Sequence, residues 1–197
     1  MMVLTVRYGK NGIANCVMNY ISRLDPARVR CDLVCPNEPG EEARALVEQT
    51  GGSVFVLAGR NRRPLAYVRR LSRLVREREI EVLHAHGNSA TLAVELIAAK
   101  RGGARVRMPH SHNTTCTMKT TDKLLRGIFY RASTDNMACS TAAGEWLYPK
   151  RDYTVLNNAI DTERFRFSAL ERERMRESLG IAKNEFVYLH VGAFNEQ

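Results

Sequence analysis

Long apolar runs are missing from this sequence, and aromatic residues are few. Aromatic residues make up 7% of the 197 residues, with a single tryptophan. A protein that binds single-stranded nucleic acid usually interleaves stacking aromatics with basic residues, so we expect no nucleic-acid partner. No stretch approaches the roughly 20 apolar residues that span a bilayer. The opening MMVLTVRYGKNG lacks the charged leader and apolar segment of a signal peptide. We therefore expect a cytoplasmic protein.

Closely paired cysteines are also absent. The five cysteines are an odd number with no CxxC pair, which argues against a disulfide framework or a zinc finger. Cys31 and Cys35 flank Leu33 in an alternating apolar run, so they should share one face of a strand. We interpret them as small core residues rather than reactive thiols.

Acidic residues are fewer than basic residues. Thirty lysines and arginines face 21 acidic residues, which gives a net charge of +9 and a pI near 9.6. Such a charge attracts polyanions, anionic lipid surfaces or phosphorylated substrates. The arginines are spread along the chain rather than gathered in a basic tail. Peripheral attachment to the inner face of a membrane is one interpretation, and a generic solvated basic surface is the other.

Short apolar, β-branched runs alternate with longer segments of helical periodicity. This alternation predicts an α/β protein with a Rossmann-like parallel β-sheet and helices on both faces. The candidate strands are Val3–Arg7, Val29–Cys35, Ser53–Leu57, Glu81–Ala85, Ala104–Pro109, Asn136–Cys139 and Tyr153–Leu156. The candidate helices are Ala14–Leu24, Glu41–Gln49, Leu65–Arg78, Ser89–Lys100, Asp122–Ala132 and Ala142–Tyr148.

The pattern changes after the last of these strands. A polar turn, NNAIDTERF, leads to a charged helical segment, Ser168–Leu179, and then to the apolar run Phe186–Gly192. A fully apolar run of this kind is typical of a strand that begins a new buried sheet. We predict one domain over residues 1–182, with the approach to a linker, and the first strand of a truncated second domain over residues 183–197.

The turn after the first strand carries Gly9, Asn11 and Gly12 just before a helix. Glycine allows a ligand to approach the backbone, and free N–H groups at a helix start favour phosphate. The spacing is not the GxGxxG of a dinucleotide site. A simple tight turn explains these residues equally well.

Four of the five histidines follow two neighbouring predicted strands, in the runs HAHGN and PHSHNTT. Ligands of open α/β sheets bind beyond the carboxyl ends of the strands, so this grouping favours a polar cleft over a structural network. His84 and His86 share one strand face, which allows a metal pair, but no third ligand with suitable spacing is evident. We expect His86 to line the cleft, whereas His84 could equally be a core histidine.

Taken in order, the motifs resemble a known family. The glycine turn, HAHGN, HSHNT, ACSTAAGEWLY, VLNNAIDTERF and HVGAFNEQ resemble the retaining glycosyltransferases of family 4 with the GT-B fold, especially the exopolysaccharide and capsule type. The resemblance covers essentially the whole chain. It implies that this chain is the N-terminal, acceptor-side domain of a GT-B enzyme, and that a C-terminal donor-binding domain is missing.

The resemblance also implies an activity. Family members move a sugar, as hexosyltransferases do, from a nucleotide-sugar donor, usually UDP-linked, to a glycan or lipid-linked acceptor with retention of configuration. Cationic side chains and a helix amino terminus stabilise the departing diphosphate, so no metal ion or other cofactor is expected. The isolated chain should be inactive.

The family's site residues can be placed by motif. His112 matches a histidine that reaches the donor sugar, and it is the expected catalytic residue, as a positioning group and hydrogen-bond donor. Ala159 replaces the glycine usual in the VLNNAIDTERF turn, and Ala193 stands where the family commonly has an arginine. The expected substrate-binding residues are Asn11, Gly12, His86, Asn88, His110, Asn113, Thr114 and Asn158.

Two alternatives remain from the sequence. A GT-B sugar epimerase would need acid/base carboxylates in this domain, and no convincing set is present. A non-catalytic basic α/β module that binds an anionic polymer or membrane would rest on the +9 charge alone.

Overall fold

The computed structural model describes residues 1–5, 9 and 12–192, so Asn11 and Ala193 lie outside the described residues. The chain divides into two compact units, Met1–Ile160 and Asp161–Gln197. The first unit contains the sheet and the expected site residues. Among the described residues, no helix has the length and apolar character that crossing a bilayer requires.

The first unit is built on seven strands that all run parallel, in the order β3-β2-β1-β4-β5-β6-β7. This confirms the predicted Rossmann-like α/β class. The strands are β1 (Met2–Thr5), β2 (Asp32–Cys35), β3 (Val54–Val56), β4 (Val82–Gly87), β5 (Val106–Ser111), β6 (Met137–Ala138) and β7 (Thr154–Val155).

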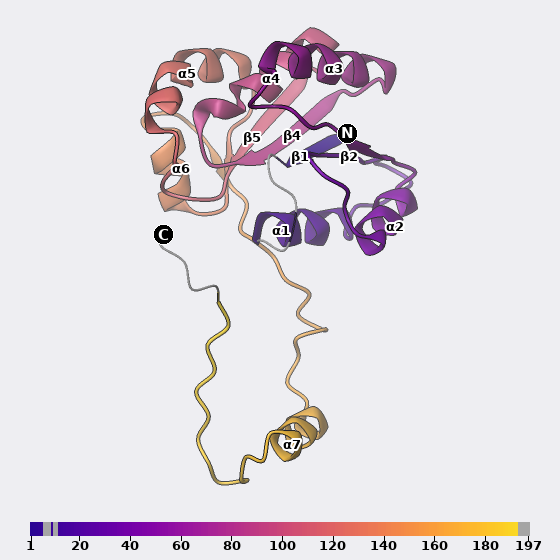
Figure 1. Cartoon of the computed structure of the whole chain (residues 1–197), viewed down its shortest axis with the longest axis vertical. Coiled ribbons are helices and arrows are strands. Elements are labelled where there is room, and N and C mark those ends of the chain that lie inside the picture. The colour runs from indigo at the N-terminus through magenta and orange to yellow at the C-terminus, as the bar shows by residue number, and fades with distance from the viewer. Residues whose placement is uncertain (6–8, 10–11, 193–197) are drawn as a thin grey trace. The chain divides into compact units, whose positions relative to one another are not determined.

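Helices cover both faces of this sheet (Figure 1), as the alternating pattern predicts. Helices α1 and α2 lie on one face, and α3, α4 and α5 lie on the other. The helices are α1 (Gly12–Ile21), α2 (Glu41–Gln49), α3 (Pro64–Glu77), α4 (Ala93–Gly102), α5 (Lys119–Ala132) and α6 (Thr141–Leu147), with a 3₁₀ turn, η1 (Ala90–Leu92), before α4.

Alternation along the strands divides the core into two layers. Val3 of β1 and Leu33 of β2 pack with α1 and α2, whereas Met2 and Leu4 pack with the helices on the opposite face. Cys31 and Cys35 are buried free thiols in the first layer, as predicted for small core residues.

Several element boundaries differ from the prediction by a few residues, and two of these differences have a clear local reason. Strand β2 begins at Asp32 rather than Val29, because the Val29 N–H donates to the Asp25 carbonyl in a turn. The helix expected from Ser89 is instead the 3₁₀ turn η1, capped by the Ser89 side chain, which leads into α4.

The second unit contains one helix, α7 (Ala169–Ser178), close to its predicted range. The strand predicted at Phe186–Gly192 is wrong for the described structure, which assigns no strand there and leaves Tyr188 92% exposed. A strand forms only where a neighbour pairs with its backbone, and none of the seven strands pairs with this segment. The predicted domain boundary at residue 182 stays a prediction.

Candidate functional site

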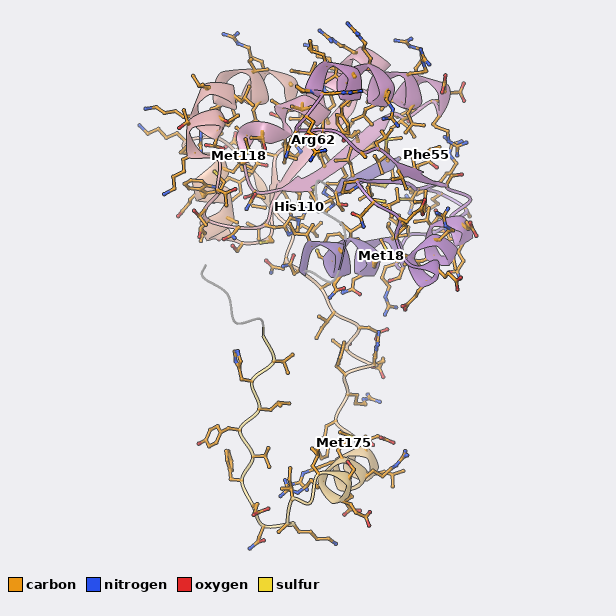
Figure 2. All side chains as sticks on the ribbon, in the orientation of Figure 1. Met18, Phe55, Arg62, His110, Met118 and Met175 are labelled. Carbon is orange, nitrogen blue, oxygen red and sulfur yellow. The ribbon has the colours of Figure 1, made fainter. Side chains whose placement is uncertain are left out.

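Two neighbouring strands bring four histidines to one face of the sheet. Strand β4 pairs with β5 so that His86 lies opposite His110. Beyond the end of β5, the His112 N–H donates to the Gly87 carbonyl at 3.1 Å, which extends the pairing by one residue. Since side chains two residues apart on a strand share a face, His84 joins the same group. Figure 2 shows His110 in the interior of the first unit.

The imidazoles contact one another directly. Nε2 of His84 is 3.1 Å from Nδ1 of His110, and Nδ1 of His86 is 2.8 Å from Nε2 of His112. The rings of His84 and His86 have centroids 4.1 Å apart. His86 and His110 are fully buried, His84 is 6% exposed, and His112 is partly exposed. His112 is therefore the most exposed of the four histidines.

All four histidines of the cluster are neutral near pH 7. Burial, together with the neighbouring imidazoles, lowers the pKa of His84 to about 4 and that of His110 to about 2. Burial also lowers the pKa of His112 to about 4, partly offset by the Asn158 side chain. The pKa of His86 falls well below its ordinary value for the same reason. A neutral imidazole offers one N–H donor and one lone pair.

Several nitrogens of the cluster have no hydrogen-bond partner among the described residues. These are Nε2 of His86, Nε2 of His110 and Nδ1 of His112. Oγ1 of Thr5, which lies opposite His86 on β1, is also buried without a partner. Such groups are uncommon in protein interiors, and a water, ligand or ion would satisfy them.

Helix α1 and the segment after β7 cover the cluster. The Tyr20 ring lies 6.2 Å from the His110 ring and nearly parallel to it. Its hydroxyl donates to the backbone carbonyls of Leu156 and Asn157, and the Cys16 thiol donates to Oδ1 of Asn158 at 3.1 Å. Sequence analysis named Asn158 as an expected substrate-binding residue, which stays a prediction, and it did not indicate Tyr20. The signal was available, because Tyr20 is a polar aromatic side chain within an otherwise apolar helical stripe.

The loop after β4 is held by residues that the sequence did not indicate. The Ala90 N–H donates to Oδ1 of Asp122 at 2.7 Å, and the Trp146 indole N–H donates to the Asn88 carbonyl at 3.2 Å. The Asn88 side chain donates to the Thr115 carbonyl at 3.0 Å, so it joins the loops after β4 and β5. Asn88 thus has a structural contact in addition to its expected role.

The remaining expected residues lie outside the cluster contacts. Asn113 and Thr114 are exposed, and the Asn113 side chain accepts the Thr114 N–H at 2.8 Å within a local turn. Gly12 is exposed at the start of α1, and a Cβ atom added there would meet nothing within 4 Å. Their roles in substrate binding stay predictions.

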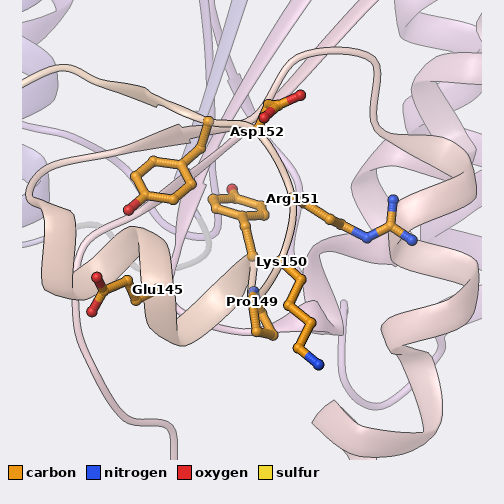
Figure 3. Close-up of a pocket in the computed structure, with 7 residues that line it drawn as sticks. Glu145, Pro149, Lys150, Arg151 and Asp152 are labelled. Carbon is orange, nitrogen blue, oxygen red and sulfur yellow. The ribbon is translucent and has the colours of Figure 1, made fainter.

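Two open cavities lie away from the histidines. The first, about 460 Å³, is lined by Glu145 and by the Tyr148–Tyr153 segment (Figure 3). The second, about 670 Å³, adjoins it and includes the Thr134–Met137 segment. No histidine is among the described residues that line them. The first lies just before β7 and the second lies where β6 and β7 begin, whereas ligands of open α/β sheets bind where strands end. We therefore assign neither cavity to the substrate.

The cluster also has a composition suited to metal binding. Potential ligand atoms of His84, His86 and His110 all lie within 4.8 Å of one another. Sequence analysis saw the pair on β4 but no third ligand, because His110 comes from the neighbouring strand and its distance in sequence gives no motif.

Solved structures with a similar fold include a glycosyltransferase and a complex with UDP and glucose. A glycosyltransferase from Rickettsia africae ESF-5 matches with a TM-score of 0.71 at 11% identity, over 93% of this chain and 50% of that one. Anabaena Alr3699/HepE, solved in complex with UDP and glucose, matches with a TM-score of 0.68 at 19% identity, over 91% of this chain and 50% of that one. The fold is that of a GT-B N-terminal domain.

The sequence comparisons identify the family. The model of Glycosyltransferase Family 4 matches residues 10–164, well over half of the chain. A curated relative, "Putative glycosyltransferase EpsF" of Bacillus subtilis (strain 168), is 29% identical over 98% of this chain and 54% of its own length. The chain belongs to Glycosyltransferase Family 4, and it spans about half the length of the relatives it matches.

Proposed function

We propose that the chain is the acceptor-side half of a retaining glycosyltransferase that moves a hexosyl group from a UDP-linked sugar to a glycan or lipid-linked acceptor. The observation that carries the proposal is the cluster of neutral imidazoles at the carboxyl ends of β4 and β5, in a chain of this family. The UDP and glucose in the HepE structure support a nucleotide-sugar donor. A second, donor-binding domain completes the enzyme.

His112 is the residue best suited to touch the sugar. It is the partly exposed member of the cluster, and its Nε2 is held by His86 at 2.8 Å. Its lowered pKa keeps it neutral, so it positions a sugar hydroxyl by hydrogen bonding without bringing a positive charge to the reacting carbon. Asn158, on the segment that covers the cluster, would adjust the same imidazole, because its side chain raises the His112 pKa against the effect of burial.

We propose that sugar transfer itself needs no metal ion. The charge on the departing diphosphate would be stabilised by cationic side chains of the donor domain and by the amino terminus of α1, which begins at Gly12. Fixed dipoles and cations stabilise a transition state in this way when they point at the negative charge that develops.

The test compares the 197-residue chain with the complete product of its gene. The complete protein is expected to release UDP from a panel of UDP-hexoses in the presence of acceptor, and the 197-residue chain is expected to bind UDP weakly and to transfer nothing. Turnover by the 197-residue chain would contradict the need for a second domain. Absence of transfer by the complete protein across donors and acceptors would contradict the proposed activity.

Helix α3 supports a further proposal, that the enzyme docks on an anionic membrane. Its exposed face and the preceding loop carry arginines that form no salt bridge within the described residues, and the nearby Leu65 is 70% exposed. Each basic side chain near an anionic surface contributes about 1 kcal/mol. The arginines are Arg62, Arg63, Arg69, Arg70, Arg73 and Arg76. Co-sedimentation with anionic but not with neutral vesicles is the expected result, together with no salt-sensitive binding to DNA.

A further inference from the structure

His84, His86 and His110 form a compact set of nitrogen ligands in the core. All three are buried, and they come from two adjacent strands whose pairing fixes their backbones. Their candidate ligand atoms lie within 4.8 Å of one another. Nε2 of His86 is buried without a hydrogen-bond partner among the described residues, which carries a desolvation cost that a bound ion would remove.

We propose that these three histidines bind one divalent transition-metal ion of the zinc class. Around a tetrahedral ion with nitrogen bonds of about 2.0–2.1 Å, ligand nitrogens lie roughly 3.3 Å apart. Nε2 of His84 and Nδ1 of His110 are already 3.1 Å apart. The third ring lies within 4.8 Å of this pair, so the three ligand atoms are already gathered near the spacing that one ion requires.

The chemistry of the ligands selects the metal. Imidazole nitrogen suits Zn²⁺, Co²⁺, Ni²⁺ and Cu²⁺, whereas Mg²⁺ and Ca²⁺ require oxygen ligands. Burial, with a smaller effect of the neighbouring imidazoles, lowers the pKa of each of the three rings, so all three are neutral. Three neutral imidazoles leave a fourth position for water or hydroxide, the arrangement of an open three-histidine zinc site. Because no carboxylate neutralises the ion, we expect its affinity to fall below that of a structural zinc site.

Metal binding by these three histidines is independent of the proposed function. Metal binding by the cluster is measured without nucleotide or sugar, and the ion is not assigned a step in sugar transfer. Occupation of the site would engage His86, whose Nδ1 contacts His112. A bound ion would therefore fix the position of the expected catalytic residue.

Cobalt titration tests the site directly. The 197-residue chain, free of any histidine tag and stripped with EDTA, is titrated with Co²⁺ while visible absorption is followed. The expected result is about one equivalent bound, with the intense ligand-field bands of a tetrahedral site. His84→Asn should weaken binding by more than about tenfold, because loss of a ligand exceeds the effect of losing an outer-shell partner. His190→Asn, a change in the second unit, is the matched control and should bind like the parent.

A second measurement uses the unsubstituted chain, so its result does not depend on whether the variant folds. X-ray absorption of the unsubstituted chain loaded with one equivalent of Zn²⁺ should show scattering from three imidazoles. Fewer than two imidazoles, or equal Co²⁺ affinity in folded His84→Asn and His190→Asn, would place the ion elsewhere and overturn the proposal. Failure of the stripped chain to bind Co²⁺ or Zn²⁺ would overturn it as well.

Discussion

Nδ1 of His86 lies 2.8 Å from Nε2 of His112, so only one of these two nitrogens carries a proton when both rings are neutral. If His86 donates through Nδ1, the lone pair of His112 Nε2 accepts, and His112 then has its N–H at Nδ1. In the other tautomer, Nδ1 of His112 has a lone pair. His86 is fully buried and His112 is partly exposed. The tautomer of His86 therefore decides whether Nδ1 of His112 donates or accepts a hydrogen bond.

The first prediction concerns His112. In the complete gene product, His112→Ala should lower the transfer rate by a factor on the order of 10²–10³, the usual effect of removing one positioned donor from a reacting centre. His112→Asn, which keeps a side-chain N–H, should restore part of that loss. Steady-state kinetics with a UDP-hexose measures both. An unchanged rate in His112→Ala would remove this residue from the mechanism.

The second prediction concerns stability in acid, measured with EDTA present. The folded-state pKa values of the cluster lie near 4 or lower, against about 6.5 in the unfolded chain. Below pH 6.5 the unfolded chain binds protons that the folded chain does not, so stability falls as pH drops from about 6.5 toward 4. Each buried imidazole contributes up to about 1.4 kcal/mol per pH unit.

Urea denaturation at pH 7.0 and pH 5.5 measures this effect, before most carboxylates titrate. His84→Asn should show a shallower dependence because it removes one of the lowered pKa values. A pH-independent free energy of unfolding in the parent would contradict the neutral, buried state of the cluster.

The sheet was predictable because its strands follow simple rules. Runs such as Ser53–Leu57 are largely apolar and β-branched, and polar turns separate them from amphipathic helices. The grouping of His86 with His110 followed from the same reasoning, since parallel strands end at one edge. The seventh strand and the α7 helix were also placed within a few residues.

Contacts between residues distant in sequence were not predictable. The cover that Tyr20 provides over His110, and the third metal ligand, depend on how helices and strands dock rather than on local pattern. The strand expected at Phe186–Gly192 is absent from the described structure for a related reason. An apolar run favours a strand, but its backbone needs a neighbouring strand to pair with.

The third prediction concerns a buried ion pair that anchors the loop after β3. The Arg60 guanidinium donates to both carboxylate oxygens of Glu95, at 2.6 and 2.8 Å, and also to the Thr91 carbonyl. The Glu95 side chain is fully buried. Glu95→Ala should lower the free energy of unfolding by about 3–5 kcal/mol, because Arg60 keeps its charge without a carboxylate to neutralise it.

The exposed pair between Arg44 and Glu38 is the control for this experiment, since its side chains are 40% and 70% exposed. Glu38→Ala should change the free energy of unfolding by less than about 1 kcal/mol. Chemical denaturation of both variants measures the difference. Equal effects of the two substitutions would show that burial of Glu95 does not determine the strength of its pair.

The fourth prediction concerns Asp122, which joins α5 to the loop after β4. One carboxylate oxygen accepts the Ala90 N–H at 2.7 Å, and the other accepts from Arg126 at 2.8 Å. Asp122→Ala leaves the buried Ala90 N–H without an acceptor, at a cost of about 1–3 kcal/mol. Amide hydrogen exchange at Ala90 should therefore accelerate. Asp122→Asn keeps an acceptor oxygen for Ala90 and should retain most of the protection. Exchange of the Ala90 amide at the parent rate in both variants would show that the Asp122 carboxylate does not hold this loop.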